Sequence, residues 1–120
     1  MSTVTRSTDD VRSEGPDGPI RVAQVEIRPQ EGLAVVAGRV VSLSVREFEL
    51  LSALATRSGH VVAREELFST VWGGPLRRGD RSIDVYVHKL RQKLEAASPG
   101  WRFIHTHIGF GYRFAPEPAA

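Results

Sequence analysis

Residues 80–94 read DRSIDVYVHKLRQKL. The apolar side chains of this stretch recur at i, i+4, i+7 and i+11, at Ile83, Val87, Leu90 and Leu94. At about 100° per residue, these positions form one narrow stripe on a helix. The spacing predicts a helix from about Arg81 to Ala96 that buries the stripe against a core, and the rest of the chain can be placed around it.

The side of this helix opposite the stripe is polar and cationic. It carries Arg81, Val85, His88, Lys89 and Gln92, with Asp84, Tyr86, Arg91 and Lys93 at its flanks. Arginine, lysine and histidine donate to guanine acceptors, glutamine pairs with adenine, and valine contacts the thymine methyl group. This mixture indicates a helix that reads base edges in a major groove, with the flanking residues near the sugar–phosphate walls. The alternative is a helix whose polar side contacts only water.

The charge of the chain is small in total but unevenly distributed. The formal net charge is +2, and the segment up to Pro19 carries two arginines against four acidic residues, so the remainder carries +4. Between Arg77 and Lys93 there are six basic residues and two acidic ones. A basic cluster in one segment is typical of a protein that binds a polyanion.

The 120 residues are enough for one domain with its own core. The chain has no cysteine, which excludes disulfides and thiolate metal sites. No apolar run approaches the roughly 20 residues of a membrane-spanning helix, and we expect a soluble cytoplasmic protein. Residues 1–19 are polar and rich in turn formers, which predicts a flexible tail or linker. A domain at 20–115 and a short disordered tail at 116–120 should follow.

Short apolar stretches predict three antiparallel strands, at 22–27, 33–37 and 39–43, with a turn at Gly38. A helix should follow, because Ser44 and Glu47 form a Ser-x-x-Glu capping box, and we expect it to end at Gly59. A second helix is predicted at 64–72, ended by the Gly-Gly-Pro sequence at 73–75, with these side chains inward: Leu67, Phe68 and Val71.

After the helix at 81–96, two extended stretches at 101–106 and 112–114 flank a glycine turn at 109–111, which predicts a β-hairpin. The fold class is therefore α+β. It consists of an N-terminal antiparallel sheet, three helices and a C-terminal hairpin. Two helices joined by a loop and followed by a hairpin are typical of a winged helix-turn-helix, in which the hairpin is the wing.

Five stretches carry a resemblance to a known family: LSVREFELL at 43–51, GHVVAREEL at 59–67, VWG at 71–73, residues 80–94, and WRFIHTHIGFGYRF at 101–114. They resemble the OmpR/PhoB-type winged-helix effector domain of bacterial two-component response regulators, in order and in register, over about 20–115. The resemblance implies a sequence-specific transcriptional regulator that binds double-stranded DNA. It also implies tandem pairing of two copies on repeated half-sites.

The resemblance assigns roles to individual positions. It implies contacts to bases or phosphates for Arg81, Val85, Tyr86, His88, Lys89 and Arg91, while Gln92 joins this group from its place on the helix. Trp72 matches an aromatic residue at the DNA backbone, and Thr106 a wing residue near phosphate. The loop after the second helix matches a segment that can touch RNA polymerase, through Gly74, Leu76, Arg77 and Arg78.

The chain departs from the family pattern at two positions. Ile108 stands where the wing usually carries an arginine that enters the minor groove, and an apolar side chain cannot read the negative potential there. His107 or Arg113 would have to take over that contact. Ala63 replaces the usual serine before the second helix, which forfeits a cap of about 1 kcal/mol. This chain also contains no receiver domain.

Other chemistries find little support. His105 and His107 could begin a metal site, but no third ligand stands at motif spacing, so we expect neither metal nor cofactor. No nucleophile motif or phosphate-binding loop is present, and we expect no enzyme. The rival function is a winged helix that binds proteins, since a fold does not fix a function. A basic, polar third helix favours DNA over that rival.

Overall fold

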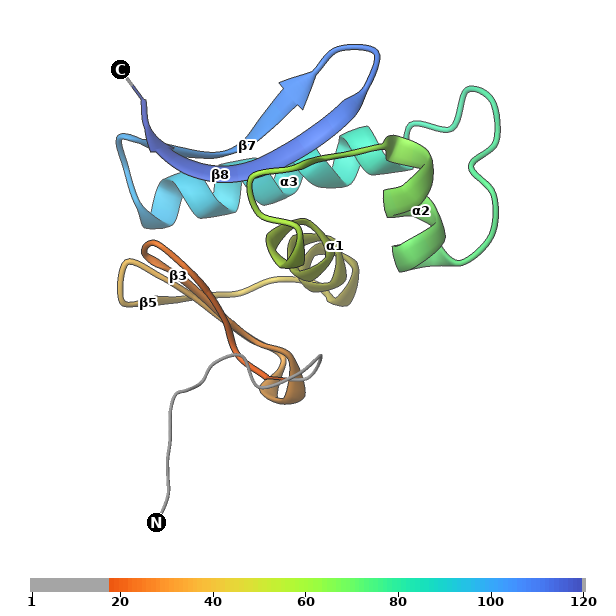
Figure 1. Cartoon of the computed structure of the whole chain (residues 1–120). Helices are drawn as coiled ribbons and strands as arrows, with labels where there is room; N and C mark the ends of the chain where they lie inside the picture. The colour runs from red at the N-terminus through yellow and green to blue at the C-terminus, as the bar shows by residue number, and fades with distance from the viewer. Residues whose placement is uncertain (1–17, 120) are drawn as a thin grey trace.

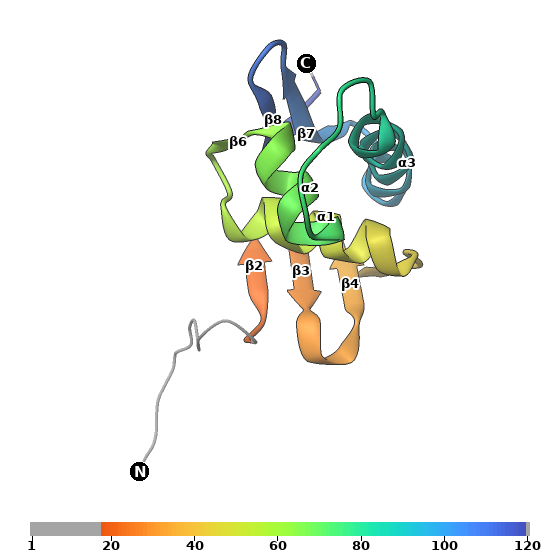
Figure 2. The same ribbon diagram turned by 90° about the vertical axis from the view of Figure 1, so that its right-hand side faces the viewer.

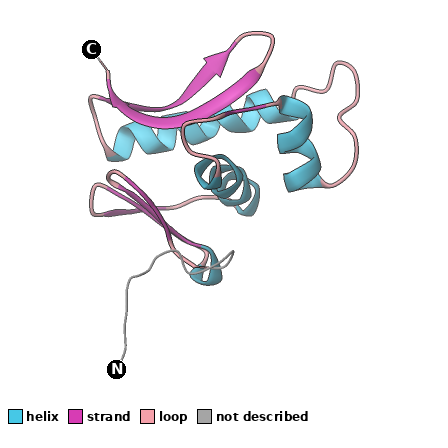
Figure 3. Ribbon diagram, in the orientation of Figure 1, coloured by secondary structure: helices cyan, strands magenta, loops and turns pink. Residues whose placement is uncertain are grey.

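The computed structural model describes residues 18–119, so the expected tail at 1–19 lies almost entirely outside the described residues. Figure 1 shows a sheet at each end of the molecule, with three helices between them. The strands of the two sheets stand out in Figure 3. The predicted α+β class is confirmed.

The N-terminal sheet has four antiparallel strands, β2 (Ile20–Val22), β3 (Val25–Arg28), β4 (Leu33–Val36) and β5 (Arg39–Val41), in that order. We predicted three, and this was wrong at the first strand, where Val22 pairs with Val25 across a tight turn. Ala23 makes the turn with a φ of 53°, in the left-handed region. Ala-Gln is not a typical turn sequence, so the residues gave no signal for it. A short 3-10 helix, η1 (Pro29–Glu31), joins β3 to β4.

Helix α1 (Val45–Thr56) begins at the predicted capping box. The Ser44 hydroxyl accepts from the Glu47 amide at 3.2 Å, and Glu47 Oε1 accepts from the Ser44 amide at 2.8 Å. The helix ends at Thr56, before the expected Gly59, whose amide instead donates to the Phe114 carbonyl at 2.8 Å. The side chains that α1 buries in the core are Leu50, Leu51, Leu54 and Ala55.

Helix α2 (Arg64–Trp72) and helix α3 (Ser82–Ala97) lie where they were predicted. The apolar stripe of α3 is completely buried, at Ile83, Val87, Leu90 and Leu94. On α2, Leu67 and Val71 are buried, but Phe68 is only half-buried, and its ring stacks on that of Trp72 with 5.2 Å between the centroids.

The C-terminal sheet has the order β6-β8-β7, formed by β6 (Val61–Val62), β7 (Trp101–His107) and β8 (Gly111–Pro118). The expected disordered tail at 116–120 is wrong for 116–118, because β8 continues until Pro118 pairs with Trp101. Proline is tolerated at the end of a strand, where no ladder hydrogen bond needs its missing N–H. Within residues 18–119, no helix is long and apolar enough to cross a membrane.

Candidate nucleic-acid interface

One side of α3 is free of the rest of the protein. In Figure 2 this helix lies along the edge of the molecule, with no other segment on its outer side. Five of its outward side chains are exposed: Arg81, Val85, His88, Lys89 and Gln92. They are the residues placed opposite the apolar stripe from sequence alone, and the structure brings them together on one surface. We call this set the outer face of α3.

The β7–β8 hairpin is attached to the middle of α3. Arg91 Nε donates to the Ile104 carbonyl at 3.0 Å, and Arg91 Nη2 donates to Thr106 Oγ1 at 2.5 Å. The Arg91 guanidinium also lies 5.7 Å from the centre of the Tyr112 ring. Two of the three guanidinium nitrogens are therefore engaged within the protein, and Nη1 is the one left to contact a ligand. These contacts fix the wing beside the outer face.

An aromatic cluster borders the outer face where α2 ends. Trp72 is half-buried between Phe68 and Tyr86, and its ring lies edge-on to Tyr86 at 5.5 Å. The Arg46 guanidinium sits 5.3 Å from the centre of the Trp72 ring, and Lys89 Nζ sits 5.3 Å from that of Tyr86. This stacking holds Trp72 and Tyr86 in place beside the cations of α3.

Comparison with known proteins fits this geometry. Residues 38–114, the part of the chain from the last strand of the N-terminal sheet through the wing, match the family described as "Transcriptional regulatory protein, C terminal". The chain belongs to this family of OmpR/PhoB-type DNA-binding domains. The predicted family and the predicted winged-helix fold are thus both confirmed.

Two curated regulators share much of this OmpR/PhoB-type sequence. The sensory transduction protein RegX3 of Mycobacterium tuberculosis is 33% identical over 113 residues, which is 94% of this chain and 50% of RegX3. The response regulator SaeR of Staphylococcus aureus is 37% identical over 82 residues, which is 68% of this chain and 36% of SaeR. The chain therefore spans about half the length of the first relative and about a third of the second.

Two solved structures of DNA-binding domains share the fold. The domain of CpxR from E. coli superposes with a TM-score of 0.73 at 33% identity, covering 85% of this chain and 98% of that one. The domain of RstA from Klebsiella pneumoniae, solved in complex with the RstA box, has a TM-score of 0.73 at 33% identity and covers 81% and 96%.

A carboxylate anchors the start of α3 in this OmpR/PhoB-type domain. Asp84 Oδ2 lies 2.9 Å from Arg64 Nη2 of α2 and 3.3 Å from Arg81 Nε, and Asp84 Oδ1 accepts from the Tyr112 hydroxyl at 2.5 Å. One side chain thus joins α2, α3 and the wing. Arg81 is held by this contact, yet its side chain remains 76% exposed. Asp84 was expected near a phosphate wall, but its oxygens already have protein partners.

The same contacts set the ionisation of Asp84 and Tyr112. Burial alone would raise the pKa of Asp84, but hydrogen bonds from Tyr112 and Arg64 and the charges of Arg64 and Arg81 outweigh it and hold this pKa below its ordinary value. Burial and the bond to Asp84 raise the pKa of Tyr112 to about 12, so its hydroxyl keeps its proton and stays a donor.

Replacing Tyr112 with phenylalanine tests this link. The substitution removes one charge-assisted hydrogen bond, so we expect the free energy of unfolding to fall by about 1.5–3 kcal/mol and the pKa of Asp84 to rise. Urea unfolding and an NMR titration of the Asp84 carboxyl measure the two effects. Tyr86→Phe is the matched control, since it removes a hydroxyl from α3 itself. An Asp84 pKa unchanged by Tyr112→Phe would contradict the link.

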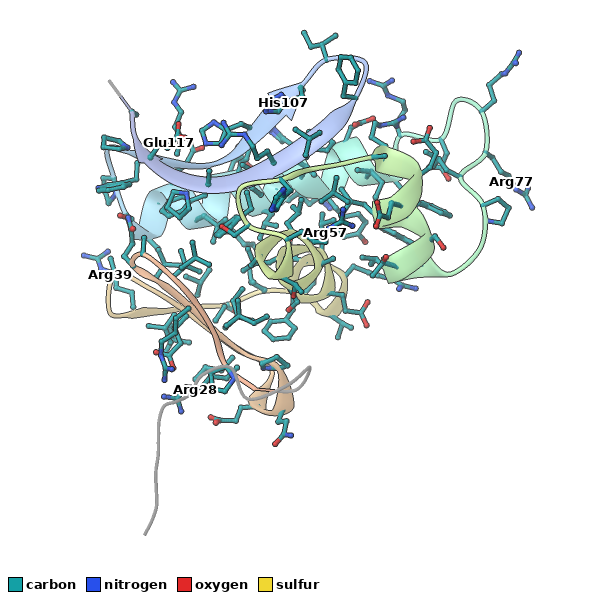
Figure 4. All side chains as sticks on the ribbon, viewed as in Figure 1. Arg28, Arg39, Arg57, Arg77, His107 and Glu117 are labelled. Carbon is teal, nitrogen blue, oxygen red and sulfur yellow. The ribbon has the colours of Figure 1, made fainter. Side chains whose placement is uncertain are left out.

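The two remaining wing candidates lie on the other side of the hairpin. Neighbouring side chains of a strand alternate in direction, and Thr106 pairs with Tyr112 on the side that meets α3. His107 and Arg113 therefore lie on the opposite side, where Arg113 Nε donates to His107 Nε2 at 3.1 Å. Figure 4 labels His107 on the hairpin. Arg113 is not brought to the outer face of α3, whereas His107 helps to line the cleft that Arg81 borders.

His105 lies on the same side of the hairpin as His107. Its Nε2 lies 2.7 Å from the Ala115 carbonyl, with a carboxylate oxygen of Glu117 at 3.6 Å. Within the described residues 18–119, no three histidine, cysteine or acidic side chains gather as metal ligands.

The loop between α2 and α3 projects from the molecule. Gly74, Arg77 and Arg78 are exposed on it, and Leu76 is half-buried. Figure 4 shows Arg77 at the outer side of this loop. The loop therefore presents two cations next to the N-terminal end of α3, on a segment that connects elements and does not contribute to the core.

Sequence reasoning missed Arg64 and Asp80 as organisers of the site. Asp80 Oδ1 accepts from the amide and hydroxyl of Ser82 at 2.8 and 2.6 Å, and Arg64 donates to the Asp80 carbonyl at 3.1 Å. Asp80 precedes Arg81, the N-cap residue of α3, so its bonds to Ser82 close the turn that leads into the helix and do not form a side-chain cap. No local pattern pointed to Arg64, which meets Asp84 across 20 positions of sequence.

Proposed function

We propose that this domain binds double-stranded DNA in a sequence-specific way by placing the outer face of α3 in a major groove. The single observation that carries the proposal is the exposure, on one helix face, of side chains that match the donor and acceptor code of base edges. Arg81 and Lys89 would donate to guanine, Gln92 would pair with adenine and Val85 would contact a thymine methyl group. His88 adds a further donor on the same face.

Contacts to the sugar–phosphate backbone would fix the register of α3 on the duplex. The aromatic cluster of Trp72 and Tyr86 supports this role, because it borders the outer face and carries Lys89. Arg91 and Thr106 contribute at the wing, with Arg91 Nη1 free to meet a phosphate. His107 helps to line the cleft beside Arg81, and Arg113 is hydrogen-bonded to it, so both would contact the DNA backbone only near the wing.

Two protein partners belong to the same proposal. A single winged helix buries a modest surface on DNA, so tight binding favours two copies on repeated half-sites. The projecting loop with Leu76, Arg77 and Arg78 would remain outside the groove, where it could contact RNA polymerase at a promoter. The domain would then act as the DNA-binding part of a transcriptional regulator in the cytoplasm.

The proposal is tested with Lys89→Ala and Arg81→Ala in the full chain. A random-sequence duplex library selected with the natural chain supplies the probe, and fluorescence anisotropy gives the affinities. We expect each variant to weaken binding by about 1–3 kcal/mol while leaving the circular dichroism spectrum unchanged. Arg39→Ala is the matched control, because it removes the same charge from β5, far from the α2–α3 loop in Figure 4.

The salt dependence of the same affinities separates DNA binding from the rival function. Log affinity should fall with log salt by about 0.9 for each phosphate neutralised, and a variant that loses one phosphate contact should lower this slope by about one. A winged helix that binds proteins would select no duplex and show no such slope. Unchanged affinity in both variants would remove α3 from the interface.

A further inference from the structure

The tip of the wing exposes two large apolar side chains. Ile108 is 89% exposed and Phe110 is 76% exposed, the highest values among the large hydrophobic residues of the described chain. Both belong to the turn between β7 and β8, on either side of Gly109. Adjacent exposed apolar side chains at a projecting tip are typical of an interaction site.

The tip projects from a rigid base. The Phe110 amide donates to the His107 carbonyl at 2.8 Å, which closes the turn. Directly after it, Gly111 is in such close contact with β6 that an added Cβ would lie 2.0 Å from the Val62 carbonyl oxygen. The next residue, Tyr112, is hydrogen-bonded to Asp84 of α3. These contacts attach the base of the tip to β6 and α3.

The tip and the start of α3 border one cleft. Ile108, Gly109 and Phe110 line one side of this cleft, which has a volume of about 410 Å³. Arg81 and Arg64 line the other side, together with the carboxylates of Asp84 and Glu65. In Figure 1 the tip lies on the same side of the molecule as the N-terminal end of α3. A duplex held on the outer face of α3 would meet the tip at its neighbouring groove.

We propose that Ile108 and Phe110 form an apolar wedge that enters the minor groove and inserts between two base pairs. This inference rests on the proposed function. An apolar side chain gains nothing from the phosphate potential, but it can replace the stacking of a base step that it opens. Pyrimidine–purine steps unstack most easily, so the wedge selects DNA by deformability at a step where no base edge is read.

The arrangement of charge favours DNA over a protein partner for this tip. Arg81, the exposed N-cap residue of α3, borders the cleft at the wedge, and Lys89 is a second exposed cation further along the same helix. A duplex satisfies both features at once, because its phosphates meet the cations while its base step receives the apolar side chains. A hydrophobic protein surface would leave those cations facing an apolar partner.

The test compares the natural chain with the double variant Ile108→Ala/Phe110→Ala on a duplex recovered from a random library by the natural chain. We expect the double variant to bind about ten- to a hundredfold more weakly, with an unchanged salt slope, because no phosphate contact is lost. 2-Aminopurine at the wing-side step should brighten when the natural chain binds, and should not brighten with the variant. The natural chain should enrich TA or CA steps at a fixed distance from the half-site.

Val40→Ala is the matched control, since Val40 is 68% exposed but lies on β5 of the other sheet. Equal affinity for the natural chain and the double variant, or no brightening at any step, would overturn the wedge. Concentration-dependent self-association that the double variant loses, with unchanged DNA affinity, would assign the tip to a protein contact instead. If Lys89→Ala weakens binding and the double variant does not, only the wedge fails. If neither Lys89→Ala nor Arg81→Ala weakens binding, the proposed function fails first.

Discussion

Replacing Gly111 with alanine should lower the free energy of unfolding by about 3–5 kcal/mol. Gly111 begins β8 with a φ of 149°, a backbone conformation that side chains of L-residues rarely adopt. Its new Cβ would lie 2.0 Å from the carbonyl oxygen of Val62 and 2.8 Å from the carbonyl carbon. Both atoms belong to backbone, so no rotamer change can relieve the overlap. The chain must separate β6 from β8, and urea unfolding measures the loss.

Gly109→Ala is the matched control for this prediction. Gly109 lies in the same turn with a φ of 82°, but an added Cβ there meets nothing within 4 Å. We expect it to lower the free energy of unfolding by about 1–2 kcal/mol, the strain of a left-handed backbone alone. Similar losses for the two variants would show that only the backbone conformation at Gly111 requires a glycine. The close contact with β6 would then not contribute to holding the wing.

The parts of the fold that sequence predicted well are those encoded over a few neighbouring residues. The buried stripe of α3 follows from its period, and the capping box needs only Ser44 and Glu47, three positions apart. The outer face of α3 follows as the complement of that stripe. The hairpin follows from its glycine turn, although the pairing of Trp101 with Pro118 near its open end had no local signal.

The contacts that tie the elements together could not be predicted. Asp84 contacts Arg64, which is 20 positions away in the sequence, and Tyr112, which is 28 positions away. Such long-range contacts depend on how the helices and the sheet pack. The partner of Lys93 could not be predicted either. A helical wheel placed it at the flank of the outer face, near phosphate, but its Nζ lies 2.6 Å from Glu47 Oε1, 46 positions away. The wheel gives a direction and does not identify the partner found there.

The contact between Glu47 and Lys93 makes Glu47 the second position of large effect. Glu47 is 3% exposed, and its Oε1 accepts both from the Ser44 amide and from Lys93. We expect Glu47→Ala to lower the free energy of unfolding by about 2–3 kcal/mol, because α1 loses its cap and α3 loses a charge-assisted bond. Glu49→Ala, on the same helix and in a surface ion pair with Arg46, should change it by less than about 1 kcal/mol.

The ionisation of Glu47 gives this prediction a pH dependence. Burial alone would raise the pKa of Glu47, but the hydrogen bonds from Lys93 and Ser44 outweigh it and hold the pKa below its ordinary value. A carboxylate whose pKa is lowered in the folded state stabilises the fold fully above its unfolded pKa of about 4.3. This stabilisation is lost as pH falls through the folded pKa.

Urea unfolding between pH 7 and pH 2 should therefore show a smaller decline in the free energy of unfolding for Glu47→Gln than for the natural chain. Part of the decline should persist in the variant, because Asp84 also has a lowered pKa. Equal declines would mean that the bonds seen at Glu47 do not favour its charged form.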